Sequence, residues 1–312
     1  MPRPIIIDTD PGTDDAVAIL LALAAPELEV LSLVAVAGNL PLDMTERNAR
    51  AILELAGRPE IPVYAGCPRP ISPGVVTAEH AHGERGLGGL VLPEPTLRRR
   101  PEHGVDVLVE RLRRAAPRSV TICALGPLTN IALALVKAPD IAAGVAELVV
   151  MGGASHALGN MTPAAEFNIH ADPLAAALVF DSAVPITLIP LDLTHQVPAT
   201  QERIERIRAL GNHCGLAAAE LMSPPRQLRR GPGAAPAWAL HDPCVIAHLI
   251  APKLFEGAEV NVAIETQSPL TLGMTLVDWR GISGRRPNAR VMTRIDADGF
   301  FALLAERLAR LP

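Results

Sequence analysis

Short apolar runs rich in β-branched residues alternate with longer Ala- and Leu-rich segments along the whole chain. The runs with the length and composition of strands are Ile5–Ile7, Val30–Ala37, Ile61–Tyr64, Val120–Ala124, Leu148–Met151, Ile186–Pro190 and Val260–Ile264. The segments with a helical period are Ala16–Ala24, Asp43–Leu55, Val105–Ala116, Leu128–Val136, Pro173–Val179 and Phe300–Leu311. This alternation is typical of right-handed βαβ units and predicts an α/β fold with a mainly parallel sheet flanked by helices.

Two stretches interrupt this alternation. Residues 66–101 are rich in Gly, Pro and His, and residues 211–237 mix basic residues with Pro and Gly. Long irregular segments in a compact domain are usually functional loops or disordered, so we expect no regular element there. The basic residues Arg226, Arg229 and Arg230 are interpreted as a solvated face. No linker is long enough to divide the chain, so we expect residues 1–312 to form a single domain.

The composition describes a chain that can bury a substantial core with few aromatic side chains. Hydrophobic residues make up 49% of the chain, with only 5 Phe, 2 Trp and 1 Tyr, so aliphatic residues must fill the core. A net charge of −5 without a basic block argues against a nucleic-acid partner. The longest apolar stretch, 16–25, is too short to span a membrane, and no signal-peptide pattern is present. The four widely spaced cysteines are expected to be reduced thiols in a cytoplasmic protein.

The sharpest local signal is the segment 8–15, with the sequence DTDPGTDD, which follows the first predicted strand. A helix capped by Thr13 or Asp14 would place one or two acids at its positive end. Capping does not explain four carboxylates in so short a segment, because buried like charges repel each other. Calcium and magnesium are bound by such oxygen ligands, so the segment predicts a metal site. A capped, solvated loop is the alternative.

Polar residues also follow the other predicted strands, at the edge where open parallel sheets bind their ligands. They are Asn39 after the second strand, Asn130 after the fourth, Asn160, Glu166, Asn168 and Asp172 after the fifth, Asp192 and His195 after the sixth, and His241 with Asp242 before a helical run at 244–250. Because the carboxyl ends of parallel strands meet at one edge, these side chains are expected to converge on the segment 8–15. The sequence therefore predicts one composite site.

These motifs resemble those of the inosine-uridine nucleoside hydrolase family. The segment 8–16 reads DTDPGTDDA, and it is followed in order by VAGN at 36–39, HG at 82–83, GL at 86–87, LGPLTN at 125–130, MGG at 151–153, EFN at 166–168, ADP at 171–173, PLD at 190–192 and HDP at 241–243. The resemblance runs from residue 5 to about residue 295. The DxDPGxDDA motif is highly specific, and the HDP motif supports it.

The resemblance implies an enzyme that hydrolyses the N-glycosidic bond of ribonucleosides to ribose and free base, on a Rossmann-like fold with a tightly bound Ca²⁺ ion. Carried over to this sequence, the metal ligands are the carboxylates of Asp10, Asp15 and Asp242 and the backbone carbonyl of Leu125. The residues that would bind ribose or lie beside the base are Asp14, Asn39, His82, Met151, Asn160, Glu166 and Asn168. The family also suggests a homodimer or homotetramer with a role in nucleoside salvage.

The same resemblance gives Asp10 and His241 catalytic roles. Cleavage of the ribosyl bond needs an activated water and a proton for the departing base. Asp10 is expected to act as the general base, because one carboxylate oxygen can bind the cation while the other accepts a proton. His241 is expected to protonate the base, and its ordinary pKa near 6.5 suits that role, with orientation or packing as the alternative. A site built around ribose hydroxyls should reject 2′-deoxynucleosides.

The segment before His241 departs from the family pattern. Family members commonly carry aromatic residues near the base there, whereas this chain has SPPRQLRR at 223–230. Trp238 is a candidate for stacking on the base, with a core position as the alternative, so a purine, pyrimidine or nonspecific preference stays open. The histidines without a recognisable partner pattern are expected at surface or packing positions. They are His80, His103, His156, His213 and His248.

Two other functions compete with hydrolysis of nucleosides. A haloacid dehalogenase-like phosphatase would use a DxDGT motif with Asp8 as nucleophile, but Pro11 spoils its spacing. That class also needs a lysine near the phosphate, and the two lysines, Lys137 and Lys253, do not follow suitable strands. A non-catalytic nucleoside- or sugar-binding protein would bind without turnover, and the presence of Asp10 with a candidate acid argues against it.

Overall fold

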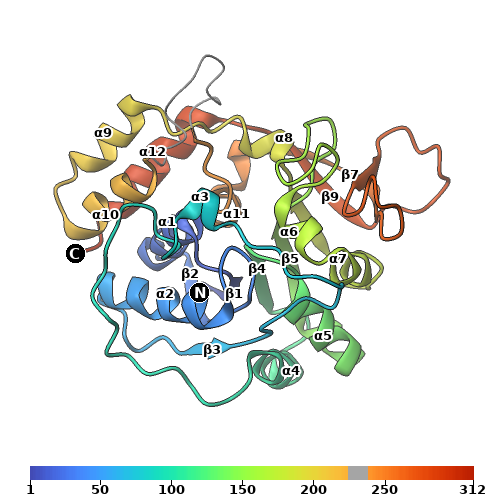
Figure 1. The fold of residues 1–312 in the computed structure, drawn as a ribbon, viewed down its shortest axis with the longest axis horizontal. Coiled ribbons are helices and arrows are strands. Elements are labelled where there is room, and N and C mark those ends of the chain that lie inside the picture. The colour runs from blue at the N-terminus through green and yellow to red at the C-terminus, as the bar shows by residue number, and fades with distance from the viewer. Residues whose placement is uncertain (224–237) are drawn as a thin grey trace.

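The computed structural model describes residues 1–223 and 238–312, so the predicted basic run at Arg226, Arg229 and Arg230 lies outside the described residues. The strands are β1 (Arg3–Thr9), β2 (Leu28–Ala35), β3 (Val63–Ala65), β4 (Val120–Ala124), β5 (Val145–Met151), β6 (Ile186–Ile189), β7 (Phe255–Ile264), β8 (Thr275–Asp278) and β9 (Ala289–Ile295). They form one sheet in the order β3-β2-β1-β4-β5-β6-β9-β7-β8 (Figure 1). In this order, every pair of neighbouring strands from β3 across to β9 is parallel, whereas β7 is antiparallel to both of its neighbours, β9 and β8.

Helices cover both faces of this sheet, which confirms the predicted α/β fold. They are α1 (Thr13–Ala24), α2 (Leu42–Leu55), α3 (Glu79–His82), α4 (Gly104–Arg114), α5 (Thr129–Lys137), α6 (Phe167–Ala171), α7 (Pro173–Phe180), α8 (Leu191–Thr194), α9 (Gln201–Arg208), α10 (His213–Leu221), α11 (Pro243–Ile250) and α12 (Ala297–Leu308). Helices α1, α2 and α9 to α12 share one core with Ile5 and Ile7, and α4, α5 and α7 share the other with Ile6. Successive residues of β1 therefore fill opposite cores, as its continuously apolar sequence predicts.

Some elements differ from the pattern-based prediction. The sequence pattern does not predict strands β8 and β9. Strand β9 reads ARVMTRI, and its exposed Arg290 and Arg294 interrupt the apolar run that would have marked it as a strand. It nevertheless lies between β6 and β7 in the sheet. The expectation of no regular element is wrong for 79–82, which form α3, and for 213–221, which form α10. Asn212 starts this helix because its Oδ1 accepts the backbone N–H of Gly215 at 2.7 Å. Within the two described ranges, no helix combines the length and the apolar character needed to cross a membrane.

Candidate active site

A cavity of about 230 Å³ opens at the carboxyl ends of the parallel strands. Its walls come from the segments after β1, β2, β3, β4 and β5, including α3, and from the residues that lead into α11. The lining residues are Asp14, Asn39, Ala78, His80, Ala81, His82, Leu125, Met151, Asn160, Met161, Glu166, Phe167, Asn168, Trp238, His241 and Asp242. Polar side chains that follow separate strands thus converge at one edge of the sheet.

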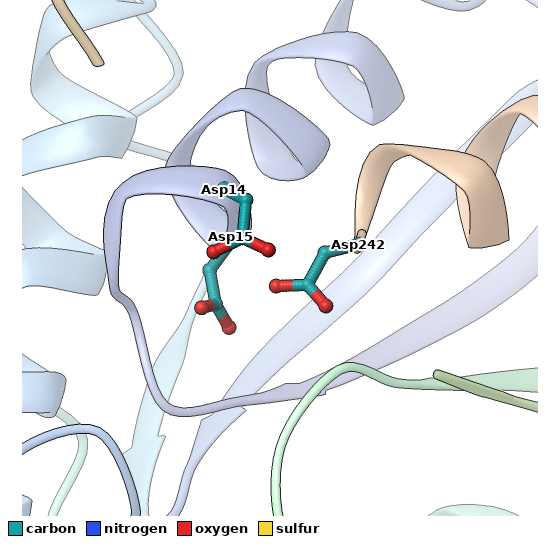
Figure 2. Close-up of side chains that lie close together, drawn as sticks. All are labelled: Asp14, Asp15 and Asp242. Atoms are coloured by element: carbon teal, nitrogen blue, oxygen red, sulfur yellow. The ribbon is translucent and has the colours of Figure 1, made fainter. Parts of the chain in front are cut away.

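Three carboxylates meet beside this cavity (Figure 2). Oxygens of Asp14, Asp15 and Asp242 all lie within 4.8 Å of one another, and all three residues are buried. Asp14 and Asp15 belong to the first turn of α1, and Asp242 immediately precedes α11. The structure therefore joins two of the predicted ligands, Asp15 and Asp242, with Asp14, which the resemblance places against the ribose. Asp10, the third predicted carboxylate ligand, is not a member of this group.

The turn before α1 fixes the orientation of Asp15. Gly12, and not Thr13 or Asp14, is the residue that caps the helix, and its backbone N–H donates to Asp15 Oδ2 at 3.0 Å. The hydroxyl of Thr9 donates to Asp15 Oδ1 at 2.5 Å. Glycine tolerates the turn, and the carboxylate at the third helical position satisfies a backbone donor that the helix leaves free. Local sequence thus holds this carboxylate in place before any ligand binds.

Asp10 lies in a narrow space next to the same turn. Its Oδ2 accepts the backbone N–H of Asn39 at 2.6 Å, whereas its Oδ1 is buried and has no partner among the described residues. A Cβ atom added to Gly38 would lie 2.9 Å from Asp10 Cγ, and one added to Gly126 would lie 2.8 Å from it. Two glycines therefore leave just enough room for the carboxylate, which has one fixed and one unpartnered oxygen.

Burial and mutual repulsion raise the pKa values of these carboxylates. Burial is the main cause for Asp10, Asp15 and Asp242, and repulsion from neighbouring aspartates raises the three pKa values further. Burial also raises the pKa of Asp8 to about 7, although Asn130 Nδ2 donates to its Oδ2 at 2.9 Å. A cation among these oxygens would remove the repulsion. The donor set therefore fits a divalent metal ion.

The opposite wall is built around Glu166 and Asn168. Both oxygens of Glu166 accept backbone N–H groups, from Asn168 at 2.9 Å and from Gly153 at 2.9 Å, which fixes the start of α6. Asn168 Nδ2 donates to the backbone carbonyls of Leu125 at 2.7 Å and Met151 at 3.1 Å. The side chain of Asn168 thus ties together the ends of β4 and β5. The Leu125 carbonyl, a predicted metal ligand, accepts this hydrogen bond and lines the cavity.

Two histidines and a tryptophan complete the cavity. His82 Nδ1 lies 3.0 Å from the hydroxyl of Thr13, and the His82 ring meets Trp238 edge to face with centroids 6.2 Å apart. His241 Nδ1 lies 2.8 Å from the hydroxyl of Thr194. Burial, assisted by neighbouring histidines, lowers the pKa of His241 to about 4, while the charge of Asp14 opposes that shift. The aromatic pair His82–Trp238 and the candidate proton donor His241 therefore line the same cavity.

The structure places most of the predicted site residues on the cavity surface. Asp10 and Asp15 lie behind the lining residues, close to Asp14 and Asp242. The expected convergence is wrong for Asp172, Asp192 and His195, which do not line the cavity, because the two carboxylates accept backbone N–H groups of other loops. Asn130 does not line it either, although its side chain donates to Asp8. His80, which was expected at a surface or packing position, is exposed and also lines the cavity. Met161 and Phe167 also line it and were missed. They adjoin predicted residues in the same loops, so proximity in sequence was the available signal.

Comparisons with known proteins agree with this geometry. Residues 5–302 match the sequence model of the family described as inosine-uridine preferring nucleoside hydrolase. The pyrimidine-specific ribonucleoside hydrolase RihA of Salmonella gallinarum is 46% identical over 312 residues, with 99% of each chain covered. Among solved structures, a purine-preferring ribonucleoside hydrolase from Gardnerella vaginalis has a TM-score of 0.90, 30% identity and 98% coverage of each chain. A plant nucleoside hydrolase has a TM-score of 0.88, 33% identity and 99% coverage of each chain.

Proposed function

The chain belongs to the inosine-uridine preferring nucleoside hydrolase family, glycosidases of the EC 3.2.2 class, and on that premise we propose a calcium-dependent hydrolysis of ribonucleosides at this cavity. The observation that carries the proposal is the buried group formed by Asp14, Asp15 and Asp242 beside a cavity that also contains His241. Three buried carboxylates this close together repel one another, and a cation between them would remove that repulsion.

We assign the cation to the oxygens of Asp15 and Asp242, with Asp10 and the Leu125 carbonyl as further ligands. Ca²⁺ is the proposed ion because every proposed ligand is an oxygen atom, the ligand type that calcium prefers. When bound, the cation would hold the ribose diol and increase the acidity of a water molecule. Asp14 lies close enough to share either the cation or a ribose hydroxyl.

Asp10 is proposed as the general base. The hydrogen bond from the Asn39 backbone fixes Oδ2 and leaves the unpartnered Oδ1 as a proton acceptor. Burial and neighbouring negative charge raise the pKa of Asp10, and a bound cation would favour the ionised carboxylate that a base needs. Asp10→Asn keeps the shape of the side chain and removes the acceptor, so it should preserve the fold and abolish nearly all turnover.

His241 is proposed as the acid that protonates the departing base. As the C–N bond breaks, its electron pair passes to the base nitrogen, which takes a proton from His241 while the water oxygen bonds to the anomeric carbon and Asp10 accepts the water proton. Solvent exchange then restores both groups. Burial lowers the pKa of His241, whereas the negative charge of Asp14 favours the protonated ring that this role requires.

The substrate class follows from the remaining wall and from the relatives. Asn160, Glu166 and Asn168 present polar groups that suit ribose hydroxyls, and His82 with Trp238 offers an aromatic surface for the base. We propose pyrimidine ribonucleosides as the preferred substrates, because the Salmonella gallinarum relative is named as pyrimidine-specific. Four expectations from the sequence stay predictions: a role in nucleoside salvage, a single catalytic domain at 1–312, a homodimer or homotetramer, and a cytoplasmic location.

The test is turnover on a panel of uridine, cytidine and inosine, with and without chelation of calcium. Release of ribose that is lost on chelation and restored by Ca²⁺ supports the proposal. Binding of nucleosides without release of ribose would instead support the nucleoside-binding alternative. For the proposed acid, His241→Ala should slow uridine hydrolysis by about a hundredfold or more and barely affect a nitrophenyl riboside, whose leaving group needs no proton. Equal losses on both substrates would overturn that role.

A further inference from the structure

Thr194 makes an unusual contact for a helical threonine. It is the last residue of the short helix α8, it is fully buried, and its hydroxyl lies 2.8 Å from Nδ1 of His241. A threonine hydroxyl in a helix commonly bonds to a backbone carbonyl three or four residues earlier. Within the described ranges, the hydrogen bond of the Thr194 side chain goes to the His241 ring instead. The hydroxyl therefore connects the turn after β6 to the residue that leads into α11.

The turn that carries Thr194 is itself firmly held. The carboxylate of Asp192 accepts three backbone N–H groups, from Ser155 at 2.8 Å, His156 at 2.6 Å and Ala157 at 3.0 Å. Gln196 Nε2 adds hydrogen bonds to the carbonyls of Asp192 and Thr293, both at 2.8 Å. These contacts tie α8 to the loop after β5 and to β9. The position of the hydroxyl is thus set by the scaffold and does not depend on a bound substrate.

The chemistry of a hydroxyl suits a proton donor that changes state. A hydroxyl can donate to Nδ1 or accept from it, so it can hold the ring before and after proton transfer. It also adds no charge, in contrast to the carboxylate that often partners a catalytic histidine. With Nδ1 engaged, Nε2 is the ring nitrogen left for the cavity that His241 lines.

We propose that Thr194 is a positioning residue that holds the His241 ring through Nδ1 and presents Nε2 to the departing base. This inference rests on the proposed role of His241 as the leaving-group acid. It predicts that loss of the hydroxyl lowers kcat on substrates that need a proton and leaves KM nearly unchanged. It also predicts that substrates whose leaving group needs no proton are spared.

The variants Thr194→Val and Thr194→Ser separate the hydroxyl from the shape of the side chain. Thr194→Val should lower kcat on uridine by about tenfold to a hundredfold, the usual effect of losing a partner that orients a functional side chain. Its kcat on a nitrophenyl riboside should fall by less than about threefold, which also shows that the variant is folded, and Thr194→Ser should recover most of the uridine rate. Thr187→Val is the matched control, because Thr187 is buried and its hydroxyl bonds to Glu147 and not to a site residue.

A double variant shows whether Thr194 acts through His241. If it does, Thr194→Val should cause no further loss on uridine in the His241→Ala background. A further loss of tenfold or so there, a normal uridine rate in the single variant, or equal losses on both substrates would each overturn the inference. Failure of the proposed acid role is recognised separately, because His241→Ala alone would then affect both substrates equally.

Discussion

Gly126 offers a direct way to disturb Asp10 without changing its chemistry. The glycine lies in the loop after β4, and a Cβ atom added there would lie 2.8 Å from Asp10 Cγ and still closer to Oδ1. Ordinary contacts of a Cβ atom begin near 3.4 Å. Gly126→Ala must therefore push the carboxylate away from the loop by up to about 1 Å, against the hydrogen bond from the Asn39 backbone.

The size of the effect follows from this crowding. Forcing an extra methyl group into a well-packed site costs about 1–3 kcal/mol of unfolding free energy. A displacement of about 1 Å in a catalytic group can lower the rate by about a hundredfold. In the Asp10→Ala background the atoms that clash are absent, so the added loss of stability from Gly126→Ala should fall below about 1 kcal/mol. The contact between the added Cβ atom and Val36 Cγ1 at 3.1 Å remains in that background and accounts for the smaller loss of stability that is left.

The assay combines urea unfolding with initial rates on uridine, both at saturating Ca²⁺. Gly211→Ala is the control, since that glycine has a positive φ of 74° and open space around it, so alanine there introduces backbone strain but no contact with the site. It should lose stability and keep its rate. A Gly126→Ala variant with wild-type stability and wild-type rate would show that Asp10 is not confined as described, and the reasoning would fail.

Three further predictions concern the whole enzyme. In chelator, thermal stability should fall as the pH rises from about 4 through about 7. Burial raises the pKa of Asp8 to about 7 and also raises the pKa values of Asp10 and Asp242, so the folded state holds protons that the unfolded chain releases. Added Ca²⁺ should raise the melting temperature and flatten its dependence on pH, and a melting temperature indifferent to both changes would contradict this. Native protein should not react with a thiol reagent near neutral pH, because burial raises the pKa of Cys67 to about 12 and of Cys214 to about 11, whereas unfolded protein should titrate all four thiols. Replacing uridine with 2′-deoxyuridine should lower kcat/KM by about 10⁴-fold, and similar rates would exclude diol recognition.

The sequence predicts the parts of the fold that depend on local patterns. The apolar run of β1, the turn at Pro11-Gly12 and the acidic start of α1 are read correctly, because strand burial and helix capping are determined within a few residues. Strand β9 could not be predicted in this way. Its arginines suit a solvated strand, and only pairing with β6 and β7 gives it a place inside the sheet.

For the site as well, the sequence predicts some features and leaves others to the folded structure. Its members can be named from motifs, but their grouping depends on side-chain geometry that spacing does not encode. Asp14 and Asp15 are neighbours in sequence and both reach Asp242, whereas Asp10 is drawn aside by the Asn39 backbone between two glycines. No sequence motif indicates a role for Thr194, because its contact with His241 forms only when the turn after β6 packs against the start of α11.

The acidic group joins residues that lie far apart along the chain. During synthesis Asp242 leaves the ribosome long after Asp14 and Asp15. Until Asp242 has been made, a nascent chain therefore carries this group of negative charges incomplete and lacks one of the proposed ligands of the cation. Competence to cleave substrates would then arise only when the segment that leads into α11 joins the first turn of α1.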